Sequence, residues 1–368
     1  MKKITARLLD LALQIQQIPA PTFHESERAK FVHARLIQEG LQEVTTDAAG
    51  NVYGRYPSPA PVLPPLVISA HLDTVFLLDT DLTTFQEGDR LYGPGIGDNS
   101  LGVAGLFGLL WLLQERAVHL PFDIWLVANS CEEGLGDLRG MKAVVDRFGK
   151  GVLAYIILEG MALGHIYHRA LGVRRYRVSV HTEGGHSWVD YGRPSAIHEL
   201  AALATRITRL EVPQKPATTL NIGIIAGGTS VNTIAAEAHF ELDLRSESLA
   251  TLENLSLKIE SLCQQAQKPG ATVEVEVIGA RPAGEIPASH SLVQLAANCL
   301  REQGIEPKLT IGSTDANIPL SRGVPAVAVG LTTGGGAHTR REFIHLAPIE
   351  KGLEALFCLV SRLRETSG

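Results

Sequence analysis

The sequence predicts an α/β protein in which a mostly parallel sheet is interrupted by an inserted, smaller α+β domain. Up to about Leu171, helical patterns alternate with apolar strands, which favours a parallel sheet with helices on its faces. From there to "RPAGEIP" (281–287) the strands alternate apolar and polar residues, as in an antiparallel sheet with one solvated face. After that segment the first pattern returns, so the chain leaves the first domain and comes back to it.

The elements of the first domain follow from their apolar patterns. Ile4, Leu8, Leu11 and Ile15 recur at helical spacing and predict an amphipathic helix over 4–17. A second helix is predicted over 25–39, followed by strands at 51–56, 65–70, 123–130 and 153–159, with an apolar helix over 100–116.

The inserted domain and the return to the first domain follow from the same reasoning. The predicted elements of the insertion are strand 174–185, helix 196–210, strands 221–228 and 238–246, helix 252–267 and strand 271–280. Helix 290–303, strand 324–331 and a closing helix 348–365 complete the chain. We therefore predict one domain from 1–171 and 282–368, and a second from 172–281.

Composition narrows the class of protein. A length of 368 residues suits two domains, and a net charge of -6 argues against a nucleic-acid partner. Arg7 and Asp10 interrupt the first apolar run, so it resembles a helix of the mature protein more than a signal peptide. No apolar stretch is expected to reach the length of a bilayer span, and no membrane partner is predicted. The four cysteines form no Cys-x-x-Cys pair, which is typical of a reduced, cytoplasmic protein.

The stretch "PPLVISAHLDTVF" (64–76) is the first sign of a functional site. An apolar strand, typical of the buried middle of a parallel sheet, stops at His71 and Asp73. Ligands of open α/β sheets bind outside the carboxyl ends of the strands. Taken alone, the pair could equally be a hydrogen-bonded structural feature at a strand end.

Other acids and a histidine occupy equivalent places. They are Asp98 in "GPGIGDNS", Glu132 and Glu133 in "DIWLVANSCEEGLG", Glu159 in "LAYIILEG", and His338 in "VPAVAVGLTTGGGAHT". Each alone could be a solvated side chain, a helix cap or a turn residue. If the strands are neighbours, however, these groups crowd into one cleft, where divalent cations are the usual counter-charge for carboxylates.

The donor types indicate which ions would bind. Imidazole nitrogen and carboxylate oxygen suit zinc, with manganese or cobalt as alternatives. Five acids and two histidines exceed what one tetrahedral ion needs, so we infer two divalent ions sharing a bridging carboxylate across roughly 3.5–4 Å.

The ordered motifs "HLDT", "GIGDNS", "CEEG", "ILEG" and "GGGAHT", with "EGGHSW" in the insertion, resemble the M20 metallopeptidase and deacylase family over nearly the whole chain. The resemblance implies a zinc-hydrolase catalytic domain with an inserted lid or dimerisation domain. It also implies one metal on His71, Asp98 and Glu159, and another on Asp98, Glu133 and His338, with Asp98 bridging.

The resemblance implies roles for three further residues. Asp73 would orient the His71 ring, and Glu132 would be the general base that takes a proton from water and returns it to the leaving amine. His186 matches a histidine that reaches the active site of the other subunit in dimeric relatives, so a homodimer through the inserted domain is expected; a turn residue is its alternative interpretation.

Substrate-binding residues are implied less strongly. Asn232 and Arg245 match residues that hold a substrate carboxylate, although Arg245 could equally form a surface salt bridge. Asp315 lies in a loop that relatives place against the substrate. Cys131 departs from the family pattern; it could compete as a ligand or be a buried, inert cysteine.

The function predicted from these residues is hydrolysis of an amide bond in an N-acyl amino acid or a related carboxylate-bearing small molecule. Within the family that the sequence resembles, a glutamate at the position of Glu159 is typical of deacylases, whereas the "GPGIGDN" loop resembles that of peptidases, so an exopeptidase acting on short peptides is the close alternative. A non-catalytic binding protein on the same scaffold is a remote one.

Overall fold

The computed structural model describes residues 1–363. These residues form two compact units, one from Met1–Ala170 with the residues from Gly284 onward, and one from Leu171–Ala283. The predicted closing helix corresponds to α9 (Ile349–Arg362), and positions 364 and 365 of that prediction lie outside the described residues.

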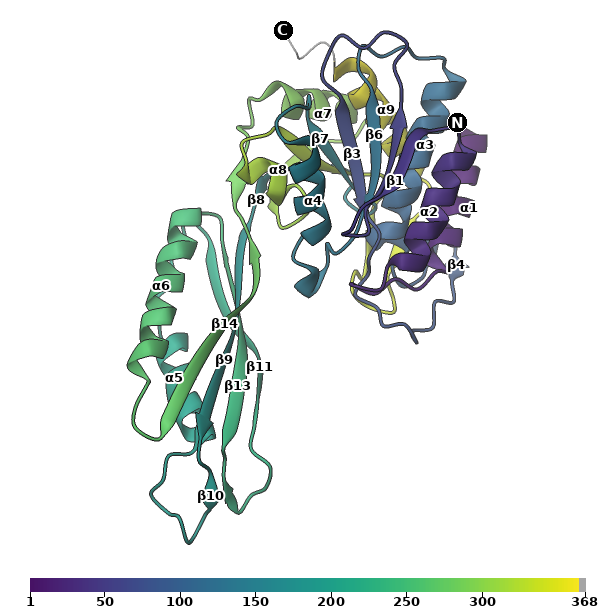
Figure 1. Ribbon diagram of the computed structural model, residues 1–368. Coiled ribbons are helices and arrows are strands. Elements are labelled where there is room, and N and C mark those ends of the chain that lie inside the picture. The colour runs from purple at the N-terminus through teal and green to yellow at the C-terminus, as the bar shows by residue number, and fades with distance from the viewer. Residues whose placement is uncertain (364–368) are drawn as a thin grey trace. The chain divides into compact units, whose positions relative to one another are not determined.

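The first unit is built on a nine-stranded sheet within residues 1–363 (Figure 1). Its order is β1-β2-β6-β3-β7-β17-β8-β15, with β16 beside β8. The strands are β1 (Gln42–Thr46), β2 (Val52–Tyr56), β3 (Leu66–His71), β6 (Ile124–Asn129), β7 (Tyr155–Glu159), β8 (His165–Ala170), β15 (Gly284–Glu285), β16 (Lys308–Gly312) and β17 (Ala326–Gly330). The central strands β6, β3, β7 and β17 run parallel, which confirms the predicted fold class, while β1, β2, β8 and β15 pair antiparallel with their neighbours in that order.

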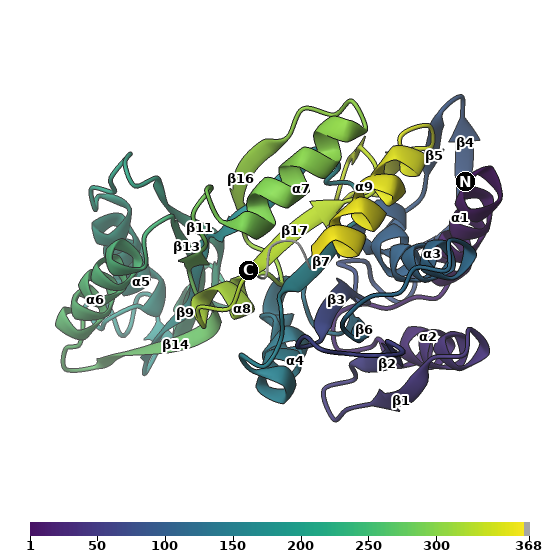
Figure 2. The ribbon, with the colours of Figure 1, turned by 90° about the horizontal axis from the view of Figure 1, so that it is seen from above.

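Helices cover both faces of this sheet (Figure 2). One face carries α1 (Lys2–Gln16), α3 (Leu101–Glu115), α7 (Ser291–Glu302) and α9, and the other carries α2 (Ser26–Gln38), α4 (Arg139–Phe148) and α8 (Asn317–Ser321). With both faces covered, the central strands are mainly apolar, and every residue of β3 and of β6 is buried.

Helix α3 lies between the sheet and a second layer formed by α1 and α9. Together with the turn before it, α3 forms a segment, Ile96–Glu115, that is long and apolar enough to span a membrane. Of its most apolar 18 residues, however, 94% are buried inside the protein. The expectation that no stretch has this length is therefore wrong. The burial is that of a core helix enclosed on all sides.

The carboxyl ends of the parallel strands lie at one edge of the sheet. His71, the last residue of β3, pairs with Asn129, the last of β6. Glu159, the last of β7, pairs with Gly330, the last of β17. The residues that follow these four strands therefore all begin at the same edge of the sheet.

A small sheet of order β18-β19-β5-β4 stands beside this edge. Its strands are β4 (Phe85–Glu87), β5 (Arg90–Tyr92), β18 (Gly334–Gly335) and β19 (Phe343–His345). Pairing of β19 with β5 joins the segment that precedes Asp98 to the loop that carries His338.

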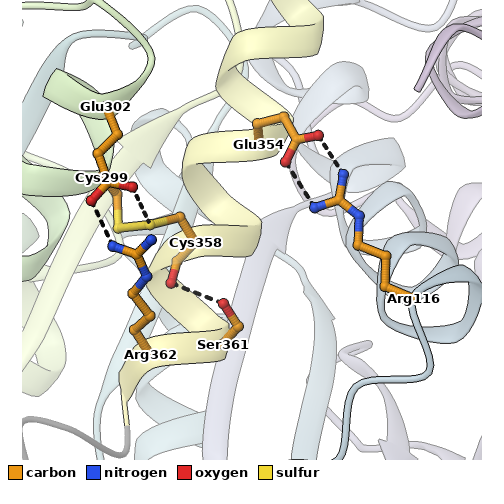
Figure 3. The surroundings of a disulfide bond; sticks show 7 residues. All are labelled: Arg116, Cys299, Glu302, Glu354, Cys358, Ser361 and Arg362. Carbon is orange, nitrogen blue, oxygen red and sulfur yellow. Dashed lines mark hydrogen bonds and ion pairs between the residues drawn. A yellow bond between two sulfur atoms is a disulfide. The ribbon is translucent and has the colours of Figure 1, made fainter.

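A disulfide joins Cys299 of α7 to Cys358 of α9 (Figure 3). Cys131 and Cys263 are free and buried. The prediction of a fully reduced chain is therefore wrong for this pair. The two cysteines are 59 positions apart, and only the packing of α7 against α9 brings them together.

The second unit is a four-stranded antiparallel sheet of order β11-β13-β9-β14 with two helices on one face. Its elements are β9 (Gly172–Thr182), β10 (Gly185–His186), α5 (Ala196–Thr208), β11 (Thr218–Gly227), β12 (Thr233–Ile234), β13 (Glu237–Ser246), α6 (Leu249–Gln265) and β14 (Ala271–Arg281). Along β9, Tyr176, Val178 and Val180 are buried in the core beneath the helices, and the alternate residues are more exposed.

Candidate metal centre

Five of the predicted ligand residues converge at the carboxyl edge of the first unit's sheet. They come from five segments: His71 ends β3, Asp98 lies in the turn 96–100 before α3, Glu133 follows β6, Glu159 ends β7, and His338 lies between β18 and β19. Ligand atoms of His71, Asp98 and Glu133 all lie within 4.8 Å of one another, which makes this group a candidate metal site.

His71 faces two carboxylates. Its Nε2 lies 3.1 Å from Oδ1 of Asp98 and 3.7 Å from Oε2 of Glu159. The ring is 1% exposed, so these acids are its immediate environment.

His338 makes the corresponding arrangement on the other side of Asp98. Its Nε2 lies 3.2 Å from Oδ2 of Asp98 and 3.2 Å from Oε1 of Glu133. The two oxygens of Asp98 are therefore divided between two imidazoles, each of which also faces a second carboxylate.

The electrostatics of this cluster are those of crowded acids neutralised by imidazole. Burial alone would raise the pKa of Asp98, but hydrogen bonds from His338 and His71 outweigh it and hold that pKa below its usual range. Hydrogen bonds to Asp98 and Glu133 raise the pKa of His338 to about 10. Burial would lower the pKa of His71, yet its carboxylate neighbours raise it well above the ordinary value. Burial raises the pKa of Glu159, with His71 opposing the shift. The cluster thus attracts positive charge.

Asp73 lies beside His71, and its carboxylate also binds a neighbouring loop. Its Oδ1 is 3.6 Å from Nδ1 of His71, and its main-chain oxygen is 3.0 Å from the same nitrogen. The carboxylate also accepts the backbone N–H groups of Glu132 and Glu133, each at 2.9 Å, and the hydroxyl of Thr22 at 2.9 Å. The side chain therefore holds the loop of the glutamate pair, and the main chain is the closer partner of the imidazole.

Cys131 is buried beside this loop. Its backbone N–H and its Sγ both donate to Oε1 of Glu25, at 3.0 and 3.4 Å. Burial raises the pKa of the thiol to about 12, so it remains protonated at neutral pH, which matches the buried, inert interpretation.

Asp315 is fully buried. Its Oδ2 accepts a hydrogen bond from the Asn129 amide at 2.7 Å, and burial raises its pKa to about 7. His71 and Glu159 are close enough for their charges to act on it. Its side chain is thus an interior group of this unit near the predicted ligands, and its contact with a substrate stays a prediction.

Sequence reasoning missed two side chains that link the ligand segments. The Asn99 amide donates to the main-chain oxygen of Leu158 at 2.7 Å and accepts the N–H of Gly160 at 2.9 Å, which brackets Glu159. Glu342 binds the backbone around Asp98. The sequence signals are weak: Asn99 merely follows Asp98, and Glu342 is a charged residue in a loop.

The remaining predicted residues belong to the second unit. His186 and Asn232 lie together in what we call the tip, residues 185–191 and 230–234, where β10 pairs with β12. Ser187 donates its N–H to the main-chain oxygen of Asn232 at 3.1 Å. Nδ1 of His186 accepts the N–H groups of Trp188 and Val189 at 3.2 and 3.3 Å.

Arg245 lies on β13, in the four-stranded sheet of this unit, far from the tip. The tip adjoins the Glu237 end of β13, and at about 3.4 Å per residue the strand from Glu237 to Arg245 spans roughly 27 Å. Arg245 forms an ion pair with Asp243 at 2.8 Å. The structure therefore does not bring Asn232 and Arg245 of one chain together.

Comparison with known proteins identifies the scaffold. Residues 67–362 match the model of peptidase family M20/M25/M40. The chain belongs to this family. As an M20 protein it is a metallohydrolase of the class that acts on amide bonds.

Relatives with different reactions resemble this M20 protein to a similar degree. It is 27% identical to carboxypeptidase G2 of Pseudomonas sp. over 78% of this chain and 71% of that one. It is 24% identical to succinyl-diaminopimelate desuccinylase of Corynebacterium glutamicum over 98% and 95%.

Solved structures share the fold. A tripeptidase from Staphylococcus aureus superposes with a TM-score of 0.83 at 22% identity, covering 98% and 99% of the two chains. A Bacillus subtilis protein described as a dinuclear metal-binding peptidase of family M20 has a TM-score of 0.71 at 16% identity and covers both chains fully.

Proposed function

We propose that the protein is a dinuclear metal hydrolase that cleaves the amide bond of an N-acyl amino acid or a related carboxylate-bearing molecule. The observation that carries this proposal is the division of the Asp98 carboxylate between His71 and His338. It gives two ligand sets that share one residue: His71, Asp98 and Glu159, and Asp98, Glu133 and His338. Two ions bridged by one carboxylate need this arrangement.

The donor chemistry fits zinc, with manganese or cobalt as alternatives. Each ligand set offers one imidazole nitrogen and two carboxylates, the mixture that zinc accepts readily. The acids are partly or wholly shielded from water and lie against one another, so a divalent cation would relieve their repulsion. When bound, such ions supply a water of lowered pKa and positive charge for the developing oxyanion.

Glu132 is the proposed general base. The residue is 6% exposed, and its backbone N–H is held by Asp73 next to the proposed ligand Glu133. A carboxylate there can take a proton from the attacking water and return it to the leaving amine. In this proposal the ligand residues bind the metal ions, and Glu132 transfers the proton.

Deacylation is the preferred reaction and exopeptidase activity the alternative. Both hydrolyse an amide next to a free carboxylate, and the relatives include proteins named for each reaction. By resemblance to other family members, Glu159 supports the deacylase and the "GPGIGDN" loop supports the peptidase.

We also propose that the inserted unit serves as a lid and forms a homodimer. Asn232 lies in the tip, near the start of β13, and Arg245 lies near the other end of that strand, so a substrate held by both would need two chains. Trp188 and Tyr191 in the tip are 85% and 90% exposed, and a second copy would cover such large side chains. His186 would then act in the partner's site.

A hydrolysis screen tests the function. Zinc- or manganese-loaded protein is incubated with matched panels of N-acyl amino acids and short peptides, and products are followed by mass spectrometry beside Glu132→Gln. Turnover of acyl amino acids alone establishes the deacylase, and turnover of peptides alone the exopeptidase. An absence of turnover on both panels, or undiminished turnover by Glu132→Gln, would overturn the proposed mechanism. An absence of turnover would also favour the non-catalytic binding protein.

A further inference from the structure

Glu342 is a buried carboxylate that the proposed reaction does not use. It is fully buried and lies four residues after His338 in the loop between β18 and β19. Within residues 1–363 it forms no ion pair with a basic side chain. An anion buried without a cation is costly unless hydrogen bonds compensate it.

Backbone N–H groups of the Asp98 turn provide part of that compensation, and burial still raises the pKa of Glu342 to about 7. The Glu342 carboxylate accepts hydrogen bonds from Gly95 at 3.0 Å, Gly97 at 2.7 Å and Asp98 at 2.8 Å. Its main-chain oxygen accepts the N–H of Gly93 at 2.9 Å. One residue therefore holds four backbone groups of the turn that presents Asp98, about 245 positions away in sequence.

The same residue is fixed relative to His338. The Glu342 N–H donates to the main-chain oxygen of Thr339 at 3.1 Å, and Thr339 donates its N–H and hydroxyl to the main-chain oxygen of Gly336 at 3.0 and 2.7 Å. His338 lies inside this compact turn, with a positive φ of 63°. The carboxylate thus connects the turn of His338 to the turn of Asp98.

A purely structural role does not need a charge here. Burying a carboxylate close to Asp98 adds like-charge repulsion to desolvation. What the carboxylate offers over an amide is two oxygens that accept all three N–H groups, since a glutamine has one acceptor oxygen. The geometry of Asp98 relative to His338 is what those three bonds define.

We propose that Glu342 is a positioning residue that fixes Asp98 and His338 as a pair for the one ion they would share. The inference rests on the proposed function, because the ligand roles of Asp98 and His338 belong to it. Residues behind metal ligands commonly change metal affinity about tenfold to a hundredfold when replaced. Glu342→Gln should therefore weaken the ion held by Asp98 and His338 by that factor, and affect the other ion, which shares Asp98 but not His338, much less.

Titration of the metal-free full chain with Co²⁺ tests this, with bound metal counted and the visible spectrum recorded. The wild type should bind two ions. Glu342→Gln should keep one tight ion, lose about tenfold to a hundredfold in affinity for the other, and lose the corresponding part of the spectrum. Glu115→Gln, the same substitution at an exposed position at the end of α3, should match the wild type.

Two further variants keep the inference falsifiable. His338→Ala should weaken the same ion, and adding Glu342→Gln to it should cause little further loss, because both act on one site. Glu342→Asp keeps the charge but has a shorter side chain, and it replaces Glu342→Gln in the titration if that variant does not fold. Its affinity for the same ion should lie between those of the wild type and Glu342→Gln.

The outcomes separate the two claims. Wild-type binding of both ions by Glu342→Gln or Glu342→Asp, even with a lower melting temperature, would overturn the positioning role and leave the proposed function intact. Fewer than two ions in the wild type would overturn the dinuclear proposal itself, and this inference with it.

Discussion

The carboxylate of Asp73 accepts the backbone N–H of Glu132 at 2.9 Å, so a side chain that follows one central strand fixes the proposed general base that follows the next. The second oxygen holds Glu133 in the same way. Asp73 therefore aligns a ligand and the base together.

Asp73→Asn should lower kcat at least tenfold with bound metal unchanged. The amide nitrogen cannot accept an N–H, so the loop loses one of its hydrogen bonds, with a stability cost of about 2 kcal/mol. Steady-state kinetics, metal content and urea unfolding measure the three quantities. Asp79→Asn, at an exposed position, is the matched control. A variant that loses metal but keeps kcat when saturated with it would instead favour the role of orienting His71.

Metal affinity should rise with pH. In the metal-free protein the pKa of His338 is about 10 and that of His71 is also raised, so at pH 7 both rings carry protons that an ion must displace. Each displaced proton changes the apparent affinity about tenfold per pH unit, in favour of binding as the pH increases. Zinc competition with a chelator between pH 6 and 8 measures the slope, and His338→Ala should reduce it by one proton. An affinity independent of pH would contradict these protonation states.

Reduction of the Cys299–Cys358 disulfide should destabilise the first unit. Closing a loop of 59 positions lowers the conformational entropy of the unfolded chain, which raises the free energy of unfolding by about 4 kcal/mol in the chain-entropy model. Urea unfolding with and without reductant measures the change, and Cys358→Ser should reproduce it. Cys263→Ser removes a free thiol in the second unit and should show no dependence on reductant. Free thiols at both positions in the purified oxidised protein would refute the pairing.

The disulfide also bears on the predicted cytoplasmic location, which stays a prediction. Disulfides are rare in the cytosol of most organisms, where thiols are kept reduced. The alkylation state of Cys299 and Cys358 in protein taken directly from cells would test both points together.

Mixing two inactive variants should restore activity if His186 acts in the partner's site. His186→Ala keeps Glu132, and Glu132→Gln keeps His186, so a mixed dimer contains one complete site. Exchange of subunits followed by an activity assay should recover up to about a quarter of wild-type turnover, since half of the dimers are mixed and each has one of two sites intact. No recovery from demonstrably mixed dimers would count against the shared site.

Several site residues could be predicted from the sequence because they end apolar strands. His71 and Glu159 follow buried runs directly, and parallel strands present their ends at one edge, so their proximity is a consequence of the fold class. Asp98 could be predicted for a related reason, because it follows a glycine turn at the start of a buried helix.

The rest could not be predicted because it depends on contacts without a sequence pattern. The oxygens of Glu342 and Asn99 bind backbone groups, and every residue except proline offers an N–H. For Asp73, a main-chain and a side-chain oxygen compete for one histidine within a few tenths of an ångström. Asn232 and Arg245 are close in sequence, but an extended strand separates them.

The metal content of the wild type and Asp98→Ala after loading and dialysis tests the central claim most directly. Because one carboxylate lies between both imidazoles, its removal should disturb both ligand sets. We predict two zinc ions per wild-type chain and loss of both tight ions in Asp98→Ala, with the variant still folded by circular dichroism. A wild type that holds a single ion, or an Asp98→Ala variant that retains one ion at wild-type affinity, would contradict a shared, bridging aspartate.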